Sequence, residues 1–581
     1  MLMNYQLNKP PGKAKLRFFW QFLQHEKLAL FVTLAAILIS SLFQLAAPTV
    51  MGHALDNYIL AGDEKGLLKV AGQLLVLFIG AFVAGYIQTT VMGGVGQRLL
   101  FTLRNAIFTK LEHMPMAFFN QNKAGDLISR INNDTEKLNQ FFSEAIMRFV
   151  GNAFMIVGAG IALLATDVHL GLATLVPALV LLFIAKLSAS YIKRTNAASL
   201  QATGNFSGAV QENLENFKVM IVFNRQDYFR TRLGQANHEN FQASQRSEFA
   251  NQVFTPLYAF VGLMAQLIAI TYGISLIMSG EITLGILISF LSYVTRFYDP
   301  LRQVASFWGS LQAALSAGDR IQHLLTLKSD LDVTAEAVVH PNKGLLTFEN
   351  VYFAYPDSAP VLKNINLTLQ PSKTYALVGP TGGGKTTTAS LIARLYDPTA
   401  GTIYLNGRDL RSYSEFERTS KIGFILQDPF LLQGTLRENI LYGNSLYAEL
   451  SNAGLMSQLE KLGLADLLTR FEQGLDTDIG SIGGTLSAGQ KQIVAFIRAI
   501  LRAPELLILD EATANIDTVT EKLLEKALEA LPNTTTRVII AHRLNTIANA
   551  DEIYFVNGGE ITPAGSLEHA MDMLLHKQRQ S

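Results

Sequence analysis

One glycine-rich loop offers the clearest chemistry in the sequence, and its residue types suit the binding of phosphate groups. It runs from Gly379 to Thr386 and fits the pattern G-x-x-x-x-G-K-S/T. The apolar run that ends at Val378 predicts a buried strand before it, and the residues after it predict a helix. In that setting, glycine N–H groups and the helix N-terminus surround phosphate oxygens. Lys385 is then placed to reach the β- and γ-phosphates of a nucleotide, and the Thr386 hydroxyl to ligate Mg²⁺.

An acidic motif further along the chain is typical of the same chemistry. Residues 506–510 read Leu-Leu-Ile-Leu-Asp, an apolar strand that ends in a carboxylate, and Glu511 follows. We expect Asp510 to hold Mg²⁺ from the far side of the phosphates. Glu511 is placed to polarise a water molecule for attack on the γ-phosphate. A single Asp-Glu pair can also be a solvated strand end, but the phosphate loop upstream favours the catalytic interpretation.

The composition indicates that part of the chain lies in a membrane. The 581 residues are too many for one hydrophobic core, so several domains are expected. Charged residues make up only 16% of the sequence, whereas soluble proteins contain about 25%. The formal net charge is zero, which predicts no nucleic-acid partner. The chain contains no cysteine, and this excludes disulfides, thiolate metal sites and cysteine nucleophiles.

Apolar runs of about 20 residues, the length that crosses a bilayer, predict six membrane spans. The six predicted spans are 28–52, 70–92, 149–166, 170–185, 254–279 and a last one that begins at Ile282 and continues past Arg296. Basic residues concentrate before the first span and in the two long segments that follow spans two and four. By the positive-inside rule, we expect these segments and both termini in the cytoplasm.

The two long segments do not have the composition of disordered linkers. Leu99, Leu103 and Ile107 keep the spacing of one helical face, so helices are expected to continue out of the membrane. Pro115 interrupts this pattern, as a turn would. The second long segment is expected to break in a similar way near residues 212–218.

The sixth predicted span carries residues that are unusual in membrane helices. Phe290, Tyr293 and Phe297 share one helical face, and Arg296 and Asp299 lie three residues apart. Charges within a membrane normally face a bundle interior or a wet cavity. Two interpretations stay open, namely a cavity wall that contacts cargo, or a self-neutralising ion pair beside an aromatic packing stripe.

A further motif lies between the two nucleotide motifs, where residues 486–490 read Leu-Ser-Ala-Gly-Gln. With it, the second half of the chain resembles the nucleotide-binding domain of an ATP-binding cassette (ABC) protein. The whole chain resembles an exporter-type ABC half-transporter. The resemblance implies an α-helical transmembrane domain with long cytoplasmic extensions (1–311), a linker (312–345) and an α/β P-loop nucleotide-binding domain (346–581).

The family pattern implies roles for residues of this sequence, with ATP and Mg²⁺ as cofactors. Tyr355 matches the aromatic residue that stacks on adenine, and His542 matches the switch histidine that contacts the γ-phosphate. The segments 114–120 and 213–218 resemble the coupling helices that face the nucleotide-binding domains. The implied catalytic residues are Glu511, His542 and Gln427, the implied metal ligands are Thr386, Gln427 and Asp510, and the implied ATP contacts are Tyr355, Thr381, Gly382, Gly383, Gly384, Lys385, Thr386, Thr387, Ser487, Gly489, Gln490 and Asp517.

The resemblance also implies an activity and a partner. It implies an integral, multi-pass ATPase of a bacterial plasma membrane that exports hydrophobic, drug-like compounds by alternating access among membrane lipids. In the family, the signature loop of one domain caps the ATP bound to the other domain, so a chain with one such domain implies a dimer. Lipid flipping, peptide export and an ATP-gated channel or sensor stay open as alternatives.

Two departures from the family pattern lie near the signature motif. Ala488 stands where the commonest signature has glycine, and the preceding loop, residues 480–483, lacks its usual glutamate. The predicted catalytic residues are intact. This asymmetry favours the catalytically intact subunit of a heterodimer with a second half-transporter chain, while a homodimer that tolerates Ala488 stays open.

Overall fold

The computed structural model describes most of the chain, namely residues 24–327, 331, 333–334, 339–340, 343–356, 358–444, 446–480, 486–510, 518–529, 531–540 and 547–578. The chain separates into two compact units. The first, called here the helical unit, contains residues 7–110 and 125–326. The second, called here the α/β unit, contains Leu111–Ala124 together with the chain from Leu327 onward.

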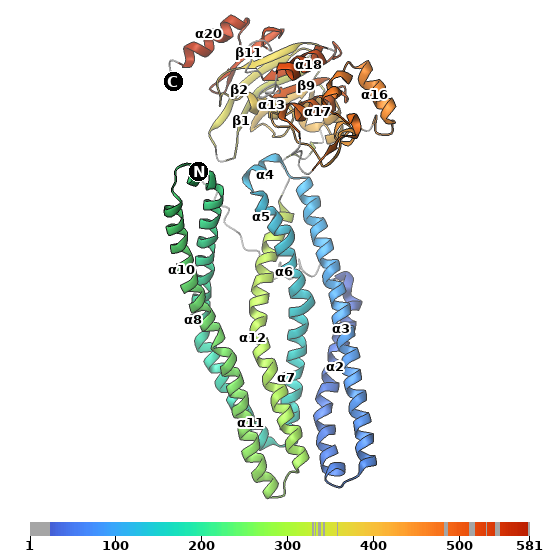
Figure 1. Cartoon of the computed structure of the whole chain (residues 1–581), viewed down its shortest axis with the longest axis vertical. Helices are drawn as coiled ribbons and strands as arrows, with labels where there is room; N and C mark the ends of the chain where they lie inside the picture. The colour runs from blue at the N-terminus through green and yellow to red at the C-terminus, as the bar shows by residue number, and fades with distance from the viewer. Residues whose placement is uncertain are drawn as a thin grey trace. The chain divides into compact units, whose positions relative to one another are not determined.

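The helical unit consists of long helices, several of which run side by side (Figure 1). Its main helices are α2 (Lys27–Ala54), α3 (Glu64–Glu112), α7 (Ile146–Thr166), α8 (Val168–Glu215), α10 (Gln226–Gln252), α11 (Phe254–Met278) and α12 (Leu284–Thr326), with the short α5 (Ala124–Ser129), α6 (Thr135–Gln140), η4 (Phe141–Ala145) and α9 (Phe217–Val222) between them. At about 1.5 Å per residue, the longest of these helices exceed the thickness of a bilayer. The predicted continuation of helices beyond the spans is therefore confirmed.

Five stretches of the described helices are long and apolar enough to cross a membrane, and each overlaps one of the first five predicted spans. They are Gln24–Ile59, Glu64–Glu112, Ala124–Thr166, Val168–Glu215 and Gln226–Met278. The predicted sixth span is helical in α12 but does not belong to this set, because Arg296, Asp299 and Pro300 interrupt its apolar run. Its crossing of the membrane stays a prediction. Helix α12 also continues without a break through residue 311, the predicted end of the transmembrane domain.

Short polar contacts fix the turns of the helical unit. The Asp167 carboxylate accepts a hydrogen bond from the Leu170 N–H group at 2.7 Å and caps the start of α8, so that α7 and α8 form a tight hairpin. The aromatic stripe of α12 is largely packing. Phe290 and Tyr293 are buried in a core with α8 and α11, and the Tyr293 hydroxyl donates to the Leu45 carbonyl oxygen at 2.7 Å.

Two sheets form the frame of the α/β unit. The four-stranded sheet has the order β2-β1-β4-β5, and the six-stranded sheet has the order β12-β11-β3-β10-β9-β6. Their strands are β1 (Leu346–Ala354), β2 (Pro360–Leu369), β3 (Thr374–Val378), β4 (Ala400–Leu405), β5 (Arg408–Asp409), β6 (Ile422–Ile425), β9 (Leu506–Asp510), β10 (Thr536–Ile540), β11 (Glu552–Asn557) and β12 (Glu560–Pro563). The strands β11, β3, β10, β9 and β6 are parallel, as an α/β P-loop domain requires.

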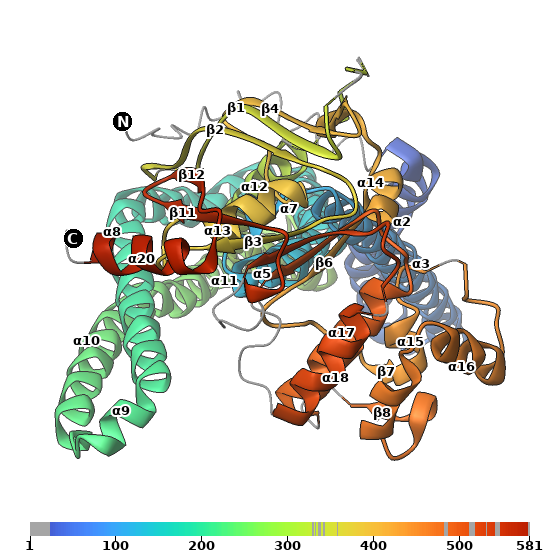
Figure 2. The same ribbon diagram turned by 90° about the horizontal axis from the view of Figure 1, so that it is seen from above.

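Helices cover the faces of these sheets, with α13 (Lys385–Ile392) between the two sheets (Figure 2). The other helices are α4 (Met116–Gln121), α14 (Glu415–Lys421), α15 (Leu436–Ile440), α16 (Asn452–Lys461), α17 (Ala488–Ile500), α18 (Thr518–Glu529) and α20 (Leu567–Gln578), and a small β-pair joins β7 (Gly434–Thr435) to β8 (Asp478–Ile479). Alternate residues of β9 serve two cores. Leu506 and Ile508 pack in the core with α13, while Leu507 and Leu509 pack in the core with α17. Burial on both faces explains why this strand reads as one continuous apolar run.

Candidate nucleotide-binding site

The predicted phosphate loop joins β3 to α13, the context that its motif needs. Gly379 has φ 154° and Gly384 has φ 115°, conformations that favour glycine. A Cβ atom on Gly379 would lie 2.0 Å from the Val556 carbonyl oxygen, so no larger residue fits. The loop residues Gly383, Gly384, Lys385 and Thr387 are buried, and Thr381, Gly382 and Thr386 are exposed. A phosphate group can therefore reach the exposed rim of a loop that a packed strand and helix hold in place.

The Lys385 ammonium group lies inside this loop. Its Nζ atom donates to the Gly379 carbonyl oxygen at 2.8 Å and to the Pro380 carbonyl oxygen at 3.0 Å. The side chain is buried, so a charged partner would interact with it more strongly than in water. The loop carbonyls hold the ammonium group where phosphate oxygens of a bound nucleotide would meet it, which fits the predicted role.

Thr386 and Asp510 bring together two oxygen ligands from distant parts of the sequence. The Thr386 hydroxyl lies 3.4 Å from a carboxylate oxygen of Asp510, which is buried at the end of β9. Strand β10 lies between the parallel strands β3 and β9. Asp510 ends β9, and the phosphate loop that leads to Thr386 follows β3, so both residues lie at the carboxyl ends of these strands. Mg²⁺ prefers such oxygen ligands together with substrate phosphates. The described residues contain no cluster of three His, Cys, Asp or Glu side chains for a metal, so an ion here would need oxygens from the nucleotide.

Tyr355 lies beside the phosphate loop. Its hydroxyl is 3.1 Å from the Thr387 hydroxyl, and its ring meets those of Phe353 and Tyr396 edge-on, with centroids 4.9 Å and 5.3 Å away. The half-buried ring of Tyr355 is therefore held next to the helix that begins at the phosphate loop. That position fits an aromatic surface for a nucleotide base.

Three further predicted residues, Gln427, Glu511 and His542, come after strands of the same parallel sheet. Gln427 comes two residues after β6, its side chain is exposed, and its backbone carbonyl accepts a hydrogen bond from the Gln492 side chain at 2.7 Å. Ile540 at the end of β10 pairs in register with Asp510 at the end of β9. Glu511 is the next residue after β9 and His542 is the second residue after β10. Both lie outside the described residues, as do Asp517 and the loop residues 481–483.

The signature residues form the start of a different helix, α17. The Ser487 side chain accepts a hydrogen bond from the Gln490 N–H group at 3.2 Å, and the Gln490 side chain accepts one from the Ser487 N–H group at 2.9 Å. This capping box fixes the loop, and Gly489 is buried in the first turn. Across the part of the chain that the structure describes, no hydrogen bond joins these residues to the phosphate loop.

Sequence reasoning missed Tyr396, which links α4 to this region within the α/β unit. The Asn120 side chain of α4 donates to the Tyr396 hydroxyl at 2.6 Å, and Ala117 packs on the core around α13. Burial raises the pKa of the Tyr396 phenol, so this group stays neutral. Because the Tyr396 ring also meets that of Tyr355, whose hydroxyl lies beside Thr387, these two rings link the segment 114–120 to α13.

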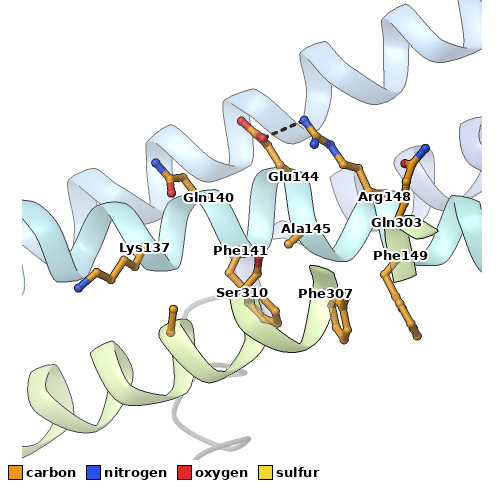
Figure 3. Close-up of a pocket in the computed structure, with 11 residues that line it drawn as sticks. Lys137, Gln140, Phe141, Glu144, Ala145, Arg148, Phe149, Gln303, Phe307 and Ser310 are labelled. Carbon is orange, nitrogen blue, oxygen red and sulfur yellow. Dashed lines mark hydrogen bonds and ion pairs between the residues drawn. The ribbon is translucent and has the colours of Figure 1, made fainter. Parts of the chain in front are cut away.

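The helical unit contains a pocket of about 420 Å³ between α12 and the helices α6 and α7 (Figure 3). One wall is aromatic, with Phe149 and Phe307 stacked at a centroid distance of 4.2 Å. The other wall is polar and carries Glu144 and Arg148, which form an ion pair at 3.1 Å. The lining is therefore amphipathic, and these two charges neutralise each other.

Comparison with known proteins gives the family. A family model described as "ABC transporter transmembrane region" matches residues 30–301, and one described as "ABC transporter" matches residues 362–514. The chain is 32% identical to the "Uncharacterized ABC transporter ATP-binding protein YfiC" of Bacillus subtilis, over 95% of this chain and 91% of that protein. It is 31% identical to an "ATP-dependent lipid A-core flippase" of Syntrophus aciditrophicus, over 92% and 88% of the two chains.

A further relative is a "Multidrug resistance ABC transporter ATP-binding and permease protein" of Lactococcus lactis, 29% identical over 96% of this chain and 94% of its own. These similarities span both units, so the membrane helices and the nucleotide site are parts of one transporter chain. The chain belongs to the ABC transporter family, and it is an exporter-type, multi-pass membrane protein that hydrolyses ATP.

Proposed function

We propose that this chain exports hydrophobic, drug-like compounds from the cytoplasm by ATP-driven alternating access. The observation that carries the proposal is the Thr386–Asp510 pair at a phosphate loop, in a chain whose described residues also form five helices of membrane-spanning length. The amphipathic pocket between α7 and α12 supports a cargo that is apolar with some polar groups. The proposal places the α/β unit and both termini in the cytoplasm of a bacterial cell, in agreement with the distribution of basic residues.

In the proposed site, residues at the carboxyl ends of the parallel strands have different roles. Thr386, Asp510 and Gln427 would hold Mg²⁺, which when bound neutralises charge that develops on the phosphates. Lys385 and the loop N–H groups would orient the phosphates, and Tyr355 would support the adenine. Glu511 would accept a proton from the attacking water, and His542 would contact the γ-phosphate.

We propose that the working unit is a dimer in which Ser487, Gly489, Gln490 and Asp517 contact the ATP held by the other chain. ABC exporters of this type work as dimers. Helix α9 and the residue after it support a partner because their apolar side chains are uncovered, with Val222 77% and Phe223 70% exposed. The altered signature at Ala488, beside an intact catalytic set, leads us to propose a heterodimer in which Glu511 serves the stronger ATP site.

Export is tested in lipid vesicles that contain this chain with and without a second half-transporter. Vesicles are loaded with fluorescent dyes or labelled lipids, and movement is followed after addition of ATP and Mg²⁺. We expect ATP-dependent movement of a hydrophobic dye. The Glu511→Gln variant should bind ATP and move nothing, and dye movement that continues in this variant would contradict the assigned base.

The heterodimer is tested by the ATPase activity of the purified chain alone. We expect low turnover that rises when the second chain is added. Robust turnover by the chain alone would exclude an obligate heterodimer and would favour a homodimer that tolerates Ala488.

Lipid flipping is the second candidate function, and the pocket of Figure 3 favours it as well. A lipid combines an apolar body with a polar head group, as the aromatic and polar walls of this pocket do. In the vesicle experiment, movement of labelled lipid without movement of dye would select flipping over drug export.

A further inference from the structure

Asp299 lies on α12 at a position that the predicted sixth span places inside the membrane, where a carboxylate is unusual. It comes 15 residues after the start of the helix at Leu284, which places it about 22 Å along the axis. The predicted span therefore holds it within a hydrocarbon layer of roughly 30 Å. Ionisable groups at such a position are costly unless they face a partner or a wet cavity.

Asp299 has no cationic partner among the side chains that the structure describes. Arg296 lies one turn earlier on the same helix, but no ion pair within 4.0 Å joins the two residues. The self-neutralising pair that their spacing allows is therefore not formed in this structure. The Asp299 side chain is instead exposed on the surface of the chain.

The carboxylate lines a cavity of about 270 Å³ between α11 and α12. Tyr258 of α11 and Tyr298 of α12 contribute aromatic surface to this cavity. The Tyr298 hydroxyl donates to the Thr174 carbonyl oxygen at 2.7 Å, which fixes the ring. Aromatic rings near a carboxylate form an environment that attracts cations, because the faces of the rings are electronegative.

Two other polar side chains of this cavity bind each other. The Gln266 side chain donates to the Thr295 hydroxyl at 2.9 Å across the gap between the two helices. Among the described residues that line this cavity, Asp299 is the only charged one. The pocket of Figure 3 differs in this respect, because Arg148 and Glu144 pair there within the chain. Selection of cargo by charge is therefore expected at Asp299.

We propose that Asp299 and the cavity between α11 and α12 bind the positively charged group of an organic cation, so that the exported compounds are cationic amphiphiles. The volume suits a substituted ammonium or phosphonium centre with part of its apolar body, since whole drug-sized ligands need a larger pocket. This inference rests on the proposed export of hydrophobic compounds, to which it adds the charge of the cargo and a site.

The test measures equilibrium binding of tetraphenylphosphonium to the complete transporter in lipid nanodiscs, without ATP. Neutral triphenylphosphine oxide serves as the uncharged comparison. We expect Asp299→Asn to weaken binding of the cation about tenfold, the scale of a lost charge contact in a partly dry site, and to leave the neutral compound within about twofold. Asp299→Glu should keep most of the affinity. Glu248→Gln, which removes an exposed carboxylate from α10, should change neither.

A second variant tests whether the cation binds in this cavity or is only attracted by the negative charge of Asp299. Gly262 lines the cavity, and Gly262→Leu should fill it and weaken cation binding while the carboxylate remains. Unchanged cation affinity in Asp299→Asn, or equal losses for the cation and the neutral compound, would overturn the proposal. The binding test contains no ATP and therefore does not depend on export. If the transporter binds the cation as described but exports no compound in the vesicle experiment, the proposed function is contradicted and the proposed binding site is not.

Discussion

At the scale of single residues, the Thr386–Asp510 pair makes the clearest prediction. Thr386→Val keeps the shape of the side chain and removes the hydroxyl 3.4 Å from the carboxylate. We expect ATPase activity to fall about 10- to 100-fold at limiting Mg²⁺, the range seen when support of a metal site is lost, and to recover in part as Mg²⁺ is raised. The measurement is the ATPase rate across a series of Mg²⁺ concentrations.

The matched variant at this position is Thr386→Ser, which keeps the hydroxyl and should keep the normal Mg²⁺ dependence. Loss of activity in both variants would point to packing of the first turn of α13, where Thr386 accepts a hydrogen bond from Ser390 through its backbone carbonyl. A Thr386→Val variant with a normal Mg²⁺ profile would exclude the hydroxyl as a ligand.

At the scale of elements, the contact between α2 and α12 predicts an unusual sensitivity to one methyl group. A Cβ atom on Gly285 would lie 2.1 Å from the Gly52 carbonyl oxygen and 2.5 Å from the Asp56 carboxylate, so the helices must move apart. The Gly285 N–H group also donates to Asp56 at 2.8 Å. We expect Gly285→Ala to cost about 1–3 kcal/mol and to lower the midpoint of thermal unfolding by several degrees.

Gly72→Ala is the control for this prediction, because Gly72 lies in α3 with no atom within 4 Å of an added Cβ. Alanine favours a helix more than glycine does, so this change should leave the unfolding midpoint unchanged or raise it. Equal midpoints for the two variants would show that α2 and α12 do not approach closely in the folded protein.

The docking of α4 supplies a second prediction at this scale. Tyr396→Phe removes the hydroxyl that accepts from Asn120 but keeps the ring that meets Tyr355. One hydrogen bond is worth about 1 kcal/mol, or roughly a fivefold change in an equilibrium. We expect stimulation of ATPase by cargo to fall by about that factor, with the basal rate preserved. Tyr554→Phe, which removes a hydroxyl bound to Glu552, should leave the stimulation unchanged.

Local signals made the strands and the phosphate loop predictable from the sequence. An apolar run before a glycine-rich loop identifies β3, and an apolar run that ends in Asp510 identifies β9. The contact of Asn120 with Tyr396 joins residues 276 positions apart, and nothing near either residue signals it. The spacing of Arg296 and Asp299 permits an ion pair without requiring one, and only packing against α11 decides where the carboxylate lies.

At the scale of the whole molecule, the predicted dimer should cover the exposed end of α9. The chain has no native cysteine, so a single introduced thiol carries a photoreactive label at one place only. Val222 is 77% exposed on α9. We expect a label on Val222→Cys to cross-link to a second chain in the assembled transporter, because uncovered apolar side chains at a helix end favour an interface.

The mass of the cross-linked product also decides the composition of the dimer. One chain has a mass of 63.8 kDa, so a homodimer gives a product of twice that mass, and a heterodimer gives this chain plus its partner. Phe416→Cys, at a residue 76% exposed on α14, is the control and should give no product between chains. We expect the heterodimer, because an altered signature at Ala488 beside an intact catalytic set is useful only where a second chain supplies the better signature. A product of two identical chains from a mixture that contains both would contradict this expectation.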